Sequence, residues 1–170
     1  MRGRGFETLM GEALARGRGD LETRSLALRR AGLWPAGRGR YAPPLDRDAL
    51  ASGLLAHFGA AKPSHAVSAC LAFGDLVEQV TLGRRLVKVL ASLLAETEEA
   101  DGVRLVVLNR TRPSAQILLR DGASRLFLPK SADEAQSGAG FDGAGEAGLI
   151  SGELLRALAR DAQSCVTGDE

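Results

Sequence analysis

The sequence has few of the features that mark secreted, membrane or disulfide-rich proteins. Two cysteines among 170 residues, not spaced as a CxxC pair, are too few for a disulfide framework. The longest apolar stretch, residues 49–61, is interrupted by Ser52, Gly53 and His57 and is shorter than a membrane span. The first 17 residues lack the apolar run of a secretory signal. We therefore expect a soluble, cytoplasmic protein.

Catalytic and metal-binding motifs are missing as well. The sequence contains no HExxH, no GxSxG, no phosphate loop and no Cys/His metal spacing. A GxGxxG match at residues 138–143 follows polar residues and no predicted strand, so it lacks the context that gives the motif meaning. His57 follows Leu54 and Leu50 at helical spacing, which is typical of a core histidine. We expect no enzyme, no cofactor and no metal, and leave open an active site without a recognisable pattern.

The net charge of +1 conceals a strong segregation of charge along the chain. Residues 1–47 carry a net charge of +5 and residues 101–130 carry +4, whereas residues 48–100 carry −2 and residues 131–170 carry −6. Two basic regions are thus separated by an apolar middle and followed by an acidic end. An acidic end of this kind can mimic nucleic acid and cover a basic face until the true ligand displaces it.

The hydrophobic pattern predicts an α+β fold, mainly a bundle of about five helices followed by a three-stranded antiparallel meander and a tethered C-terminal helix. Helices are predicted at 6–16 and 20–31, and after the capping residues Asp46, Ser64 and Thr81. Alternating apolar residues predict the strands within about 103–128, with Asp121-Gly122 as a hairpin turn. The expected organisation is a helical DNA-binding domain with the meander at 1–130, an acidic Gly/Ala-rich linker at 131–150 and an amphipathic helix at 151–165.

The strongest functional candidate is a loop rich in arginine and glycine at residues 36–41. It follows a predicted helix, and it lies beside the chain's only Trp and contains its only Tyr. Arginine neutralises phosphate or binds guanine edges, and glycine lets a backbone approach closely. A helix, this loop and a further helix form a plausible variant of a helix-turn-helix. The alternative is a solvated surface loop with Trp34 inserted into the bundle.

Other arginines could extend such an interface. Arginines next to glycines near the N-terminus could follow a nucleic-acid backbone, and two arginines at the predicted hairpin tip could form a wing. The candidate nucleic-acid-binding residues are Arg38, Arg40, Tyr41, Arg29, Arg30, Arg18, Arg110 and Arg112. DNA is the expected partner, and a dimer would suit a symmetric operator.

A protein-interaction adaptor is the competing interpretation. Aromatic and arginine-rich patches also form protein interfaces, and the C-terminal helix could occupy a partner's groove or pack against its own bundle. Its contact residues would be Trp34, Leu154, Leu155 and Leu158, and its partner RNA polymerase or a nucleoid protein.

Two resemblances bear on these alternatives. Gly32, Leu33, Pro35, the two arginines of the loop and Tyr41 resemble the region of MerR-type regulators in which a helix ends and a wing follows. The loop, the apolar bundle and a strand with TRPSAQI are similar to phage-derived regulatory proteins, including those associated with gene transfer agent clusters. The resemblance implies a regulator of transcription from phage-derived genes.

Overall fold

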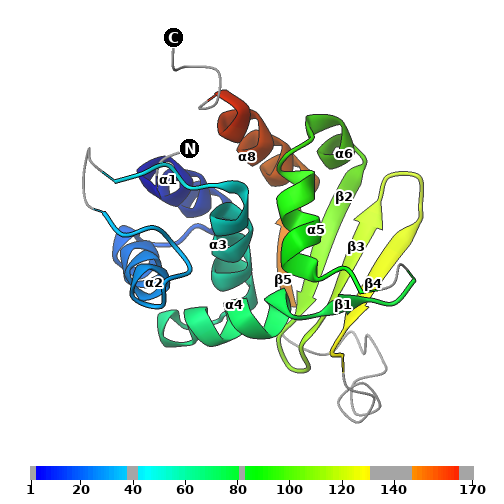
Figure 1. Ribbon diagram of the computed structural model, residues 1–170, viewed down its shortest axis with the longest axis horizontal. Coiled ribbons are helices and arrows are strands. Elements are labelled where there is room, and N and C mark those ends of the chain that lie inside the picture. The colour runs from blue at the N-terminus through cyan, green and yellow to red at the C-terminus, as the bar shows by residue number, and fades with distance from the viewer. Residues whose placement is uncertain (1–2, 38–41, 81–82, 131–146, 165–170) are drawn as a thin grey trace.

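The chain folds as helices packed against one face of a single antiparallel sheet (Figure 1). The computed structural model describes residues 3–37, 42–80, 83–130 and 147–164. Within these ranges there are seven α-helices and a short 3-10 helix, Pro63–His65. The α-helices are α1 (Gly3–Leu14), α2 (Arg18–Arg30), α3 (Arg47–Gly59), α4 (Ala66–Gly74), α5 (Leu86–Leu93), α6 (Thr97–Asp101) and α8 (Gly152–Ser164).

Helix α3 is the centre of the helical layer. Asp46 caps it, because its Oδ1 accepts a hydrogen bond from the backbone N–H of Ala49 at 2.8 Å. Every residue from Ala49 to Gly59 is buried, so α3 is enclosed on all sides. A helix that is apolar all round belongs in the core of a protein. Helices α2, α4 and α5 and strand β5 (Ala147–Ser151) pack around it.

The sheet has five antiparallel strands in the order β1-β4-β3-β2-β5. The remaining strands are β1 (Val77–Glu78), β2 (Val103–Asn109), β3 (Ser114–Leu119) and β4 (Ser124–Leu128). Because side chains alternate along a strand, one face of the sheet is turned to the helices. The fully buried residues on that face are Val106, Leu108, Ala115, Ile117, Phe127 and Ile150.

The α+β class and the central β2-β3-β4 meander are confirmed, but the predicted element counts are wrong. The predicted linker at 131–150 overlaps a strand, since β5 pairs with β2, and the predicted meander becomes a five-stranded sheet. Helix α6 forms within the acidic stretch after Glu96, which adds to the predicted bundle. The predicted fifth helix begins at Leu86, five residues after the predicted cap at Thr81.

Glycine lets β5 approach the helical layer closely. A Cβ atom at Gly148 would overlap the carbonyl group of Phe58 in α3, so no other residue fits there without moving the strand. An AGLIS segment with glycine at an inward position gives a weak strand signal, so the sequence pattern favours a linker here. None of the described helices has both the length and the apolar character that crossing a membrane requires.

Candidate nucleic-acid interface

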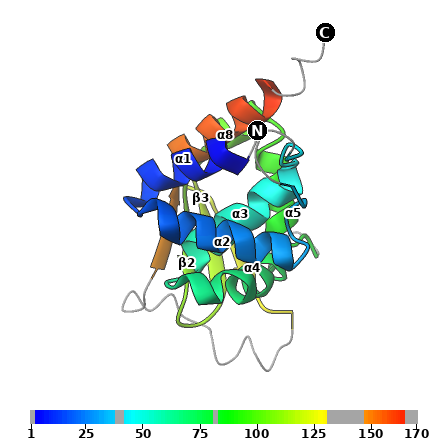
Figure 2. The same cartoon turned by 90° about the vertical axis from the view of Figure 1, so that its left-hand side faces the viewer.

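Helices α1 and α2 form a helical hairpin at one side of the molecule, where they lie side by side and are joined by a short turn (Figure 2). The turn comprises residues 15–17, and Ala15 adopts a left-handed backbone conformation with φ of 48°. This conformation reverses the chain within three residues, although a residue with a Cβ adopts it at a cost of roughly 1 kcal/mol. Phe6 and Met10 of α1 and Leu28 of α2 belong to the same buried core. A turn of this length between two packed helices is typical of an αα-hairpin.

Helix α2 has one buried and one open face. Leu21, Arg24, Ser25 and Leu28 recur at helical spacing and are buried against the rest of the protein. The opposite face is exposed to solvent, and no described element covers it (Figure 2). Its exposed residues are Arg18, Gly19, Glu22, Thr23, Leu26 and Arg30.

The buried guanidinium of Arg24 holds α2 on the end of α3. The last carbonyls of a helix have no partner within the helix, and extended Ala60 (φ −100°) provides no glycine cap here. Arg24 donates hydrogen bonds to the carbonyl oxygens of Ala56 and Ala60 at 3.1 Å and of Ala61 at 3.2 Å. Its Nε also donates to Asp20 at 2.8 Å, so the buried charge is paired. The open face of α2 is thereby fixed relative to the core.

Two more arginines complete this cap on α3. Arg16 donates to the carbonyl oxygen of His57 at 3.0 Å, and Arg110 donates twice to that of Phe58, at 2.8 and 3.0 Å. Burial lowers the pKa of Arg16, and the neighbouring charge of Arg24 lowers it further. Cations near a helix C-terminus are favoured by the helix dipole.

His57 is a neutral residue beneath this cap. Burial, followed by the positive charges of Arg24 and Arg16, lowers its pKa to about 3. Its ring meets that of Phe6 edge-on at 5.6 Å, and neither ring nitrogen has a hydrogen-bond partner within the described residues. The expectation of a core histidine fits this environment.

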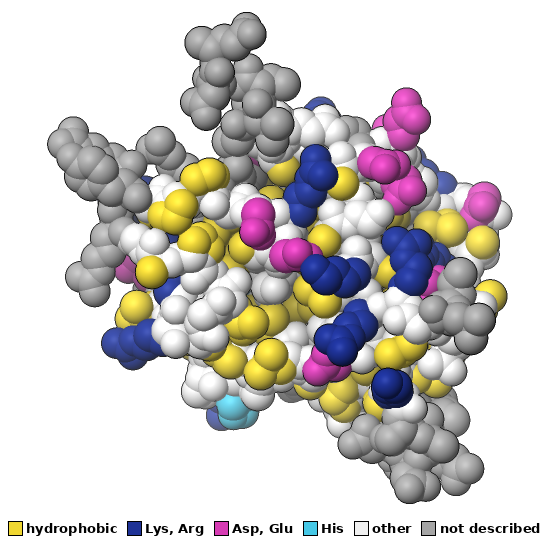
Figure 3. Space-filling model, in the orientation of Figure 1, with side chains coloured by type: hydrophobic (Ala, Val, Ile, Leu, Met, Phe, Trp, Pro, Cys, Tyr) yellow, Lys and Arg dark blue, Asp and Glu magenta, His cyan; other side chains and the backbone are white. Residues whose placement is uncertain are grey.

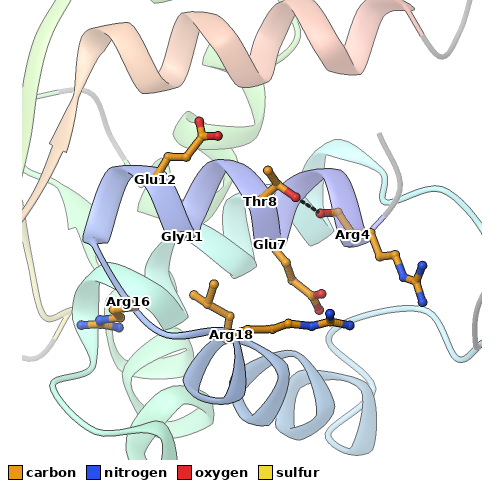
Figure 4. Close-up of a pocket in the computed structure, with 8 residues that line it drawn as sticks. Arg4, Glu7, Thr8, Gly11, Glu12, Arg16 and Arg18 are labelled. Carbon is orange, nitrogen blue, oxygen red and sulfur yellow. Dashed lines mark hydrogen bonds between the residues drawn. The ribbon is translucent and has the colours of Figure 1, made fainter.

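A groove of about 410 Å³ runs between α1 and α2 (Figure 4). Arg4 and Arg18 line it with Glu7 and Glu12, so its charge is mixed. Arg18 and Glu7 extend toward each other across the groove, whereas Glu12 points away from α2 (Figure 4). The Nε of Arg18 donates to Glu22 at 2.6 Å, and this hydrogen bond raises the pKa of Arg18.

The predicted nucleic-acid-binding residues lie in different environments. Arg18 and Arg30 are exposed on α2, and Arg112 is exposed in the turn between β2 and β3. Arg29 is half-buried with its guanidinium 5.6 Å from the ring centre of Trp34. Arg110 is half-buried on Phe58, so the predicted wing contributes only Arg112 as a free cation at this turn. Arg38, Arg40 and Tyr41 lie outside the described residues.

The predicted partner-binding residues belong to the core. Trp34 is buried, its Nε1 donates to the carbonyl oxygen of Ala49 at 2.7 Å, and its ring meets Phe6 edge-on at 5.3 Å. Leu154, Leu155 and Leu158 are buried on the inner side of α8, which packs on α6 and the sheet. In this conformation none of the four side chains is available to a partner. The C-terminal helix was expected either to pack against its own chain or to occupy a partner's groove, and in the structure it packs against its own chain.

Exposed cations also occur elsewhere on the molecule, and some of them are paired with acidic side chains. Figure 3 shows basic side chains interspersed with acidic ones on the face that carries α5 and β1. Lys88 forms an ion pair with Asp48 at 2.9 Å, and Arg85 forms one with Asp75 at 3.3 Å. Arg30 and Arg112 take part in no such pair among the described residues.

Sequence reasoning missed Arg24, the residue that fixes the interface. The signal was present, because Arg24 lies between Leu21 and Leu28 at the spacing of the buried face. An arginine at such a position indicates a buried acceptor, here the α3 terminus.

Comparison of the chain with family models, curated proteins and solved structures finds no match.

Proposed function

We propose that this protein is a DNA-binding regulator that places the open face of α2 on duplex DNA. The observation that carries the proposal is a helical hairpin whose second helix is anchored to α3 on one face and uncovered on the other. In the helix-turn-helix motifs with which we compare this hairpin, the N-terminal part of the second helix contacts base edges in the major groove. The width of that groove admits one α-helix.

The chemistry of the open face suits this role. Arg18 and Arg30, near the two ends of α2, can bind phosphate or guanine, and Thr23 between them offers a hydroxyl. Leu26 can contact a thymine methyl group. Helix α3 does not suit it, because its residues from Ala49 to Gly59 are all buried. The helix that we propose for the major groove is therefore α2, which precedes the Arg/Gly loop, and not α3, which follows it.

The Arg/Gly loop provides the second contact in this proposal. Gly32, with φ of 72°, turns the chain directly after α2. Residues 38–41 follow the exposed Arg30 shortly afterwards in the sequence. A helix followed by an arginine-rich loop is also the order in the MerR-type resemblance, which does not extend to the helices that follow. Regulation of phage-derived genes, in the cytoplasm, is the biological role that we propose on the resemblance to phage-derived regulatory proteins.

The test is the salt dependence of binding to random-sequence duplex DNA, measured by fluorescence anisotropy between about 50 and 300 mM salt. Replacing Arg38 and Arg40 together by alanine should remove two phosphate contacts and flatten the log-log slope by about 2 units. Replacing Arg84 and Arg104 together by alanine is the matched control, because it removes the same charge from exposed positions far from α2. Equal slopes for the two double variants would refute specific use of the loop, and absence of binding at low salt would refute the function.

A further inference from the structure

The face of the sheet that is turned away from the helices is apolar. Strand register places one set of alternating side chains on this outer sheet face, with Val107 between Gln116 on β3 and Leu149 on β5. The aliphatic members of the outer sheet face are Val77, Leu105, Val107, Leu118, Leu126, Leu128 and Leu149.

The core of the protein does not use these side chains. None of them belongs to the buried core cluster or to the half-buried residues packed against it. Leu149 is 53% exposed, and the other six are half-buried. The described helices lie on the other side of the sheet (Figures 1 and 2). An antiparallel sheet with one solvated face normally alternates apolar-in and polar-out, so this pattern indicates a second buried face.

Apart from Arg85, which pairs with Val77 at the edge of the sheet, and the exposed Arg104, which lies at the strand irregularity beside Leu105, the polar side chains on the outer sheet face are uncharged. Gln116 lies at its centre, and the others are serines and one asparagine near the strand ends: Asn109, Ser114, Ser124 and Ser151. The centre of this face has no cation to neutralise phosphate, which argues against nucleic acid as its ligand. Charged side chains are depleted in interface centres, and interfaces between identical subunits are the more apolar class.

We propose that the outer sheet face binds the same face of a second copy of this chain, forming a symmetric dimer. In a two-fold interface each patch meets itself, so a patch with an uncharged centre is self-complementary there without like-charge repulsion. Two such sheets pack face to face about 10 Å apart, as in a β-sandwich.

The size of the patch sets the expected strength. Five strands at about 4.8 Å spacing and five residues at about 3.3 Å rise give a footprint of roughly 400 Å² per copy. Because side chains protrude from the sheet, the accessible surface area that the dimer buries is larger than this footprint. That area is at the low end of the range for specific complexes. We expect a dissociation constant in the micromolar range. The dimer does not depend on DNA binding by α2, and it is measured without DNA.

The test is sedimentation velocity from about 1 to 200 µM protein, the range in which a micromolar dimer dissociates. The wild-type chain should show a concentration-dependent monomer–dimer equilibrium, and Leu149→Lys should raise its dissociation constant at least tenfold. Leu71→Lys on α4 is the matched control, since Leu71 is 51% exposed and lies on a helix on the other side of the sheet, so dimerisation should be unchanged.

Two results from the wild type and the single variants would overturn the proposal. One is a wild-type monomer at every concentration, which would mean that another partner or another part of the chain covers this face. The other is a dimer that Leu149→Lys and Leu71→Lys weaken equally. A double variant, Leu118→Lys with Leu149→Lys, tests the centre of the patch, and its thermal melt distinguishes a folded monomer from unfolding. A folded double variant that still dimerises as the wild type would also overturn the proposal.

Discussion

Replacing Arg24 by methionine should destabilise the protein by about 3 kcal/mol. Methionine retains most of the aliphatic stem and removes the guanidinium, which leaves the carbonyl oxygens of Ala56 and Ala60 buried without this donor. Each buried acceptor that loses its partner costs about 1–3 kcal/mol. The exposed Ala61 can bind water instead, and part of the loss is offset because a charge no longer has to be buried.

The assay is thermal and urea unfolding followed by circular dichroism. For a chain of this length a loss of about 3 kcal/mol lowers Tm by roughly 6–12 °C. Arg30→Met is the matched control, because Arg30 lies on the same helix with an exposed side chain and its loss should change stability by less than about 0.5 kcal/mol. Equal stability of Arg24→Met and the wild type would refute the view that this guanidinium anchors α2 to α3.

Two further predictions concern stability. His57 has a folded pKa of about 3 and an unfolded pKa near 6.5, so the unfolded state binds the proton first and stability falls as pH falls through this window. The loss should reach about 2 kcal/mol at pH 5 and be absent in His57→Leu, and parallel urea-unfolding profiles of the two proteins between pH 7 and 5 would contradict it. Gly148→Ala should destabilise by several kcal/mol because its Cβ would overlap the Phe58 carbonyl group, whereas Gly19→Ala, with no atom near its Cβ, should be neutral. Similar melting temperatures for the two variants would exclude the close approach of β5 to α3.

The sequence predicted the elements whose signals are local. The cap at Asp46, the stop at Gly32 and the three central strands follow from side chains within a few residues of each position. Strand β5 was missed because its signal is a long-range one. Only glycine fits at position 148, because a carbonyl group of α3, ninety residues earlier in sequence, lies against it.

The candidate site was predicted less completely than the fold. A count of arginines along the sequence cannot separate Arg30, which is exposed, from Arg110, which is turned inward onto the carbonyl of Phe58. The same limit applies to Trp34. The sequence left open whether its indole contacts a partner or inserts into the bundle, and in the structure it inserts into the bundle. The carbonyl groups at a buried helix terminus need hydrogen-bond donors from other parts of the chain, and only the three-dimensional structure shows which side chains reach them.

The most direct test of DNA binding by α2 is a titration of the 15N-labelled protein with a short duplex at low salt, followed by amide chemical shifts. DNA binding through α2 should shift the amide signals of Arg18, Thr23 and Arg30 and of residues 36–41, with no shifts on the outer sheet face. Absence of shifts in α2, or shifts confined to the sheet, would contradict it.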